Sequence, residues 1–89
     1  MTKSIHSLEM QALLNWLRET RESQGLSMRE MGERIGHPHS FVQKVEVGER
    51  RLDVVEFIWY CEALGVQPQT GMNIVQNYRV RLKNLFKNF

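Results

Sequence analysis

Four glycines constrain this chain more than any other feature, because they divide it into segments of helical length. They stand at positions 25, 36, 48 and 65, and glycine is common just past the last turn of a helix. Between them, apolar residues recur at helical spacing, and no alternating run lies between hairpin signals. The sequence therefore predicts an all-α protein without an internal repeat.

Two of the predicted helices begin with a capping box. In this motif, the side chain of a polar cap residue accepts from the backbone N–H of a glutamate three residues later, and the glutamate side chain accepts from the backbone N–H of the cap residue. An apolar residue just before the cap often packs against another just after the glutamate. This motif occurs twice, as Leu26, Ser27, Glu30 and Met31 and as Leu52, Asp53, Glu56 and Phe57. Five helices are predicted, at about 7–24, 27–35, 38–47, 53–64 and within 71–89.

The second and third predicted helices are short and are joined by the turn "GHP", residues 36–38. Proline suits the first position of a helix because the N–H that it lacks has no intrahelical partner there. The third helix is therefore predicted to begin at Pro38. Two short helices joined by a three-residue turn that contains glycine are the sequence form of a helix-turn-helix.

Length and composition exclude several classes of protein. A chain of 89 residues has room for one domain and a small core, but not for a large active-site cleft. No apolar run approaches the roughly 20 residues of a membrane span, and the N-terminus lacks the apolar block of a secretory signal. A cytoplasmic protein with no membrane partner is expected. Cys61, the single cysteine, lies in an apolar run and is predicted to pack in the core.

No pattern in the sequence predicts a metal site, a cofactor or catalysis. His37 and His39 flank a proline, but no cysteine or carboxylate cluster stands near them at zinc-type spacing. There is no glycine-rich phosphate loop after a strand, no nucleophile elbow and no convincing pair of catalytic carboxylates. The chain is therefore expected not to be an enzyme and to need no cofactor.

The positive charge of the chain is concentrated at its C-terminus. The net charge is +2, and the only charged residues after Glu62 are Arg79, Arg81, Lys83 and Lys87. Apolar residues recur every three or four positions in the same segment, so its helix is amphipathic with a basic polar face. That face either stays solvated or contacts a polyanion, and the sequence leaves both possibilities open.

Residues 17–66 resemble the helix-turn-helix domain shared by the lambda repressor and Cro proteins, the XRE family. The stretch "HSFVQKVEVGERRLDVVEF" is similar to a compact subgroup of single-domain bacterial regulators in that family. The resemblance implies a five-helix lambda-repressor-like domain with a C-terminal amphipathic helix. It places Gly32 where the two central helices cross, in place of the commoner alanine, at a cost of roughly 1 kcal/mol in helix propensity. It also implies an ion pair between Arg21 and Glu46.

The resemblance further implies that the outer face of the third helix enters the major groove of DNA. The side chains able to reach base edges are then His39, Ser40, Gln43 and Lys44. Glutamine suits adenine N6 and N7, and lysine suits guanine O6 or N7. Phosphate contacts, which set position rather than sequence, are expected from Arg29, Arg50 and Arg51.

Two positions depart from the family pattern. Met28 stands where a glutamine often contacts the DNA backbone, and His37 stands where an apolar residue is more usual. Because methionine cannot donate a hydrogen bond, the first of these backbone contacts is expected to be absent. His37 is left without an assigned role.

A homodimer is expected, because helix-turn-helix proteins usually bind as two-fold dimers to half-sites about one helical turn apart. The DNA-binding domain is predicted to cover residues 1–70, and the helix within 71–89 to contribute to the dimer. The predicted interface residues are Trp59, Tyr60, Ile74, Tyr78, Leu82, Leu85, Phe86 and Phe89, which together exceed what one helix comfortably exposes. The alternative is a C-terminal helix that folds back entirely on its own domain.

The leading hypothesis is a sequence-specific transcription regulator that binds double-stranded DNA at an inverted repeat. It would control its own gene or a restriction-modification, plasmid or prophage locus. A second hypothesis is the antitoxin of a toxin–antitoxin pair, in which the C-terminal helix binds a toxin protein. A third is a binder of membrane surfaces or polyanions through the basic, aromatic tail.

Overall fold

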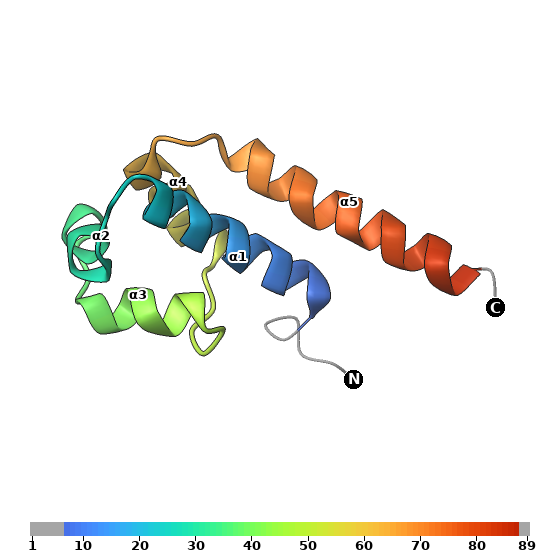
Figure 1. The fold of residues 1–89 in the computed structure, drawn as a ribbon, viewed down its shortest axis with the longest axis horizontal. Coiled ribbons are helices and arrows are strands. Elements are labelled where there is room, and N and C mark those ends of the chain that lie inside the picture. The colour runs from blue at the N-terminus through green and yellow to red at the C-terminus, as the bar shows by residue number, and fades with distance from the viewer. Residues whose placement is uncertain (1–6, 88–89) are drawn as a thin grey trace.

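Five helices joined by short connections make up the described part of the chain, residues 7–87 of a computed structural model, and no strand occurs in this range (Figure 1). They are α1 (Leu8–Ser23), α2 (Met28–Ile35), α3 (His39–Glu46), α4 (Val54–Leu64) and α5 (Pro68–Lys87). In Figure 1, α3 runs along one edge of the molecule, and the second half of α5 extends past the end of α1. The predicted all-α fold with five helices is confirmed.

Both predicted capping boxes are present. At the start of α2, the Ser27 hydroxyl accepts from the N–H of Glu30, and the Glu30 carboxylate accepts from the N–H of Ser27, each at 3.0 Å. At the start of α4, Asp53 and Glu56 exchange the same two bonds at 2.8 and 3.0 Å. The side chain of Ser7 caps α1. Residues close in the sequence therefore set where three of the helices begin.

The starts of α3 and α5, which both lie at or next to a proline, differ from those predicted. Pro38 is the N-cap of α3 rather than its first residue, because its ψ of 160° is extended. α5 begins at Pro68, three residues before the segment 71–89 in which the sequence predicts this helix. The proline ring fixes φ but not ψ, so proline alone does not decide whether a helix includes it.

The core lies where α1 to α4 meet. Its fully buried side chains are Leu17, Met31, Val42, Val45, Tyr60 and Cys61. Cys61 packs in the core as predicted, and burial raises the pKa of its thiol to about 11. The thiol is therefore protonated at neutral pH and is not a nucleophile.

The assignment of Tyr60 to a dimer interface is wrong. Its side chain is 1% exposed within the domain, so it has no surface to offer a second copy. Burial also raises the pKa of its phenol, and the hydroxyl has no hydrogen-bond partner among the described residues. α4 carries apolar residues on all sides, so the sequence pattern did not show which of them face inward.

Gly32 marks a close approach between α2 and the turn that leads to α3. A Cβ atom at this position would lie 2.4 Å from the carbonyl oxygen of His37 and 3.2 Å from the carbonyl carbon of Pro38. The N–H of His37 donates to the carbonyl of Gly32 at 2.9 Å. Even a methyl group has no room here unless the backbone moves, so this chain requires glycine where the family commonly has alanine.

Arg21 and Glu46 form the ion pair implied by the resemblance and connect α1 to α3. The Arg21 Nε and Nη2 atoms donate to the two Glu46 oxygens at 2.6 and 3.1 Å. Its Nη1 donates to the carbonyl of Leu26 at 2.6 Å. The side chains are 8% and 3% exposed, and the hydrogen bond with Glu46 raises the pKa of Arg21. The guanidinium of Arg21 therefore stays charged while it is buried.

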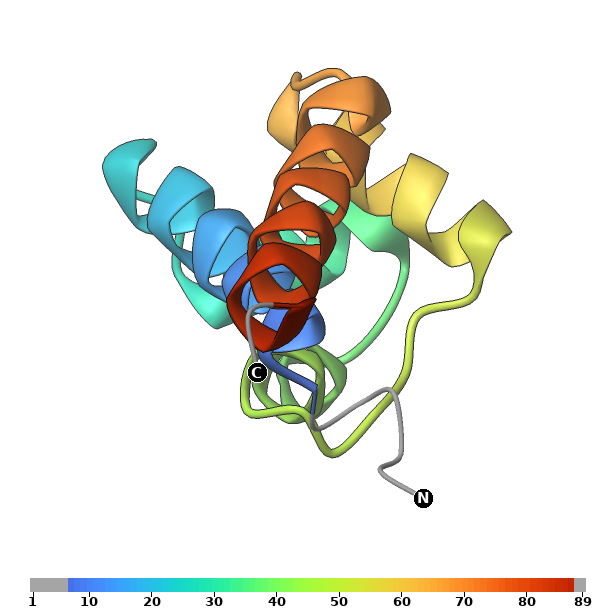
Figure 2. The same cartoon turned by 90° about the vertical axis from the view of Figure 1, so that its right-hand side faces the viewer.

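The first half of α5 packs against α1 and α4, and Figure 2 shows it between them when viewed nearly end-on. Gly71 lies at the closest point, since a Cβ there would be 2.8 Å from the rings of Phe57 and Trp16. Farther along, Arg79 forms an ion pair with Glu9 of α1 at 3.5 Å. The first three turns of α5 thus belong to the same packed unit as α1 to α4.

Removing one partner of the Arg21–Glu46 pair is expected to lower the free energy of unfolding by about 3 kcal/mol. Glu46→Ala leaves a buried guanidinium without its counter-charge, and such losses are typically about 3–5 kcal/mol. The combined Arg21→Met, Glu46→Leu variant removes both charges and is expected to lose less than the single variant. Urea unfolding measures both effects. A loss below about 1 kcal/mol for Glu46→Ala would contradict this prediction.

The two capping boxes predict a loss of stability in acid. Hydrogen bonds with Ser27 lower the pKa of Glu30 below 4.5, and bonds with Asp53 and Arg50 do the same for Glu56. The pKa of each glutamate is lower in the folded state than in the unfolded state. The two carboxylates therefore stabilise the fold above about pH 4.5, and this stabilisation is lost as the pH falls through their folded-state pKa values. Urea unfolding from about pH 7 to about pH 3 should show the loss.

The matched variant carries Glu30→Gln and Glu56→Gln. Glutamine keeps the capping oxygen but does not titrate, so the variant should lose less stability in acid than the wild type. An acid loss of equal size in both proteins would show that other groups cause it.

Candidate nucleic-acid interface

α3 buries one face and exposes the other. Val42 and Val45 are fully buried, because residues three apart lie on the same side of a helix. The predicted base-contacting residues, His39, Ser40, Gln43 and Lys44, are all exposed. None of their side chains forms a hydrogen bond or ion pair with another described residue. They can therefore bond to a ligand without breaking an intramolecular contact.

The N-terminus of α3 is open to solvent. Of the helix starts described for α1 to α4, only that of α3 lacks a side-chain cap. Pro38, His39 and Ser40 are exposed there. The free N–H groups and the positive end of the helix dipole in this first turn are favourable for an anion such as a phosphate.

The three arginines that are predicted to contact phosphates differ in whether their guanidinium groups are paired within the protein. Arg29 and Arg51 are exposed, and neither guanidinium has a partner among the described residues. Arg50 instead bonds to Glu56, with Nη2 2.7 Å from Oε2 and Nη1 3.3 Å from Oε1. The sequence analysis missed this pair, for which the only signal was a glutamate six residues after the arginine.

His37, which had no predicted role, packs against an aromatic ring in the structure. Its ring stacks on Phe41, with centroids 4.1 Å apart and an interplanar angle of 15°. Phe41 is half-buried and packs against the core. On the same ring lies the Arg50 guanidinium, 5.1 Å from the centroid. Met28, the other departure from the family pattern, packs partly buried against the core.

The predicted dimer residues other than Tyr60 differ in exposure. Trp59 and Leu85 are 50% and 56% exposed, whereas Ile74, Tyr78 and Leu82 are half-buried. The side chain of Phe86 and the whole of Phe89 lie outside the described residues. In the basic tail, Arg79 pairs with Glu9 and Arg81 lies over the Tyr78 ring at 5.6 Å.

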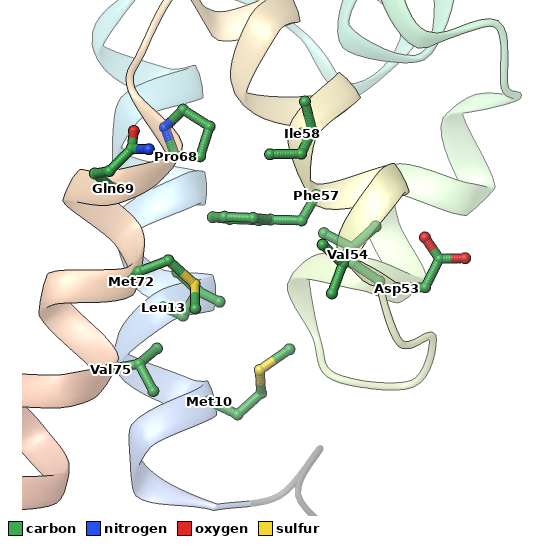
Figure 3. A pocket seen from close by; sticks show the side chains of 11 residues that line it. Met10, Leu13, Asp53, Val54, Phe57, Ile58, Pro68, Gln69, Met72 and Val75 are labelled. Atoms are coloured by element: carbon green, nitrogen blue, oxygen red, sulfur yellow. The ribbon is translucent and has the colours of Figure 1, made fainter.

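The outer face of α4 is apolar as well as the inner one. Val54, Val55 and Trp59 are 78%, 56% and 50% exposed. Beside this face, a groove of about 390 Å³ runs between α1, α4 and α5, with Phe57 of α4 facing Met72 of α5 across it (Figure 3). Apolar surface of this kind usually marks an interaction site.

Within residues 7–87, no group of three or more His, Cys, Asp or Glu side chains is arranged to hold a metal ion. No helix in this range combines the length and the apolar character that crossing a membrane requires.

Comparisons with known proteins identify the family. The Helix-turn-helix family model matches residues 17–70, more than half of the chain. Among solved structures, an XRE-family like protein from Pseudomonas syringae pv. tomato str. DC3000 is 40% identical, with a TM-score of 0.75 over 84% of this chain and 92% of that one. The restriction-modification controller protein C.AhdI from Aeromonas hydrophila is 30% identical, with a TM-score of 0.62 over 66% of this chain and 86% of that one.

The clp gene regulator ClgR from Corynebacterium glutamicum shares the fold, with a TM-score of 0.70 at 22% identity, over 82% of this chain and 95% of that one. No curated protein matches the chain. The chain belongs to the XRE family of helix-turn-helix proteins. It is a DNA-binding regulator of transcription and not an enzyme.

Proposed function

We propose that the chain regulates transcription as a homodimer that reads an inverted-repeat operator, with one α3 in the major groove of each half-site. The observation that carries this proposal is the outer face of α3, where His39, Ser40, Gln43 and Lys44 are exposed and unpartnered among the described residues. Each good bidentate contact to a base edge discriminates by about 1–3 kcal/mol. A few such contacts in one half-site give limited selectivity for a DNA sequence. A dimer that reads two half-sites is more selective than a single domain.

The apolar outer face of α4 supports a second copy of the chain as the partner. Neighbouring exposed apolar side chains often mark an interaction site, and Val54, Val55 and Trp59 are exposed in the single chain. α4 begins directly after the loop that follows α3, so this face adjoins the DNA-reading part of the domain. The apolar stripe of α5 extends the same interface in this proposal, whereas Tyr60 does not contribute.

Phosphates are contacted by basic side chains on either side of α3. Arg29 in the first turn of α2 and Arg51 in the loop 47–53 are exposed and have no partner in the described range. Contacts of this kind place the protein on the duplex and make its affinity fall with salt through release of counterions.

The similarity to C.AhdI supports a role as a controller of a restriction-modification locus, including control of the chain's own gene. The likeness covers 66% of this chain, which is enough to include a whole DNA-binding domain. The genes controlled by the chain would then lie next to its operator.

Selection of bound sequences from a random duplex pool tests the reading face. The wild type is expected to recover an inverted repeat. The Gln43→Ala, Lys44→Ala variant should bind that repeat roughly tenfold or more weakly and relax the preference at the bases read by these side chains, because it loses bidentate contacts. Asn15→Ala, which removes an exposed side chain of α1, is the matched control and should select the same repeat. Equal selection by the double variant would disprove the assignment.

Sedimentation velocity tests the dimer. Val55→Asp places a charge on the outer face of α4 and is expected to give monomers that bind the operator at least roughly tenfold more weakly, because each half-site then binds alone. Val80→Asp, at a position of α5 with similar exposure (50% against 56%), is the control and should remain dimeric. The proposed α4 surface is wrong if Val55→Asp stays dimeric, and Leu85→Asp then tests the α5 stripe in its place.

A further inference from the structure

Arg50 is held by protein groups although its side chain is 43% exposed. Its two terminal nitrogens bond to the two oxygens of Glu56 at 2.7 and 3.3 Å, and Nη1 also donates to the carbonyl of Arg51. Its guanidinium lies over the Phe41 ring, 5.1 Å from the centroid. Paired, charge-assisted bonds of this kind fix both the position and the plane of a guanidinium.

The contact continues through Phe41 to the turn before α3. The ring of His37 also stacks on Phe41, with the two ring centroids 4.1 Å apart. We call His37, Phe41, Arg50 and Glu56 the Arg50 stack. Its members come from the α2–α3 turn, the first turn of α3, the loop 47–53 and the first turn of α4. The stack thus joins the base-reading end of α3 to α4.

Arg51, the next residue, is in the opposite situation. Its side chain is exposed and makes no hydrogen bond or ion pair with a described residue. A phosphate contact by Arg51 requires no intramolecular bond to break. The same contact by Arg50 requires the loss of its bonds to Glu56, whose own side chain is only 14% exposed.

We propose that Arg50 is a positioning residue that holds the first turn of α3 in its reading orientation through Phe41, while Arg51 makes the phosphate contact of this loop. The proposal rests on the proposed function, because it divides the DNA-binding work of one loop between two neighbouring arginines. It assigns sequence selectivity to Arg50, acting through α3, and salt-dependent affinity to Arg51.

The test measures the affinity of the full chain for the selected operator and for random duplex of the same length over a series of salt concentrations. Loss of one phosphate contact lowers the slope of log affinity against log salt by about 0.9, so a substitution that removes it from both copies of the dimer lowers the slope by about 1.8. Arg51→Ala should show this change and weaken binding to both duplexes equally. Arg50→Ala should leave the slope unchanged and lower the ratio of operator to random affinity roughly tenfold, the effect of about one mismatched base pair.

Two further variants separate positioning from charge. Arg50→Lys keeps the charge but cannot form the two-bond, stacked arrangement, so it should behave as Arg50→Ala does. Phe41→Leu removes the ring and leaves Arg50 in place, and it should also lower the ratio without changing the slope. Circular dichroism at the binding temperature identifies which variants are folded. If Arg50→Ala is not folded, the measurements on Phe41→Leu and Arg50→Lys test the positioning role of Arg50 in its place.

The proposal is overturned if Arg50→Ala lowers the slope by about 1.8 with an unchanged ratio and Arg50→Lys restores wild-type binding. It is also overturned if Arg51→Ala leaves the slope unchanged. Failure of the proposed function is seen separately in the wild type, which would then bind operator and random duplex equally. In that case the slopes on random duplex still assign the phosphate contact to one of the two arginines. A wild type that binds no DNA overturns both.

Discussion

The arrangement of the helix-turn-helix depends on the missing side chain at Gly32. Because backbone atoms of the turn stand 2.4 Å from where a Cβ would lie, α2 and the start of α3 approach more closely than any other residue permits without a backbone shift. This approach sets the direction in which α3 leaves the turn. Arg21 and Glu46 then tie the other end of α3 to α1. A helix fixed at both ends presents its outer side chains at defined positions, as the proposed readout of base edges requires.

The charged residues of the domain divide into those that are paired and those that are free. Arg21 and Arg50 each make two bonds to a glutamate and connect α3 to the helices around it. Lys44, Arg29 and Arg51 are exposed and unpartnered in the described range. In the proposed function, the paired arginines hold the interface in shape, and the free basic groups remain available to DNA. A net charge of only +2 is therefore compatible with DNA binding, because the distribution of free charge matters more than its total.

Features that depend on neighbours in the sequence were predictable. Both capping boxes formed as predicted, because the bonds between Ser27 and Glu30 and between Asp53 and Glu56 span three residues of one helix. Val42 and Val45 are both buried because residues three apart lie on the same side of a helix. Features that join distant segments were not predictable from spacing. Neither the stacking of His37 on Phe41 nor the Arg50–Glu56 pair had a sequence motif, and the family resemblance was needed for the Arg21–Glu46 pair.

By itself, the sequence determined the five helices and most of their boundaries, because capping and helical periodicity are encoded within one or two turns. It also showed that α4 is rich in apolar residues, but not which of them are buried. The tertiary structure decided that, placing Tyr60 in the core and leaving Val55 and Trp59 outside. It likewise decided which of two adjacent arginines is held and which is free. The physical reason is that burial and pairing depend on atoms brought together by packing, which a linear pattern does not specify.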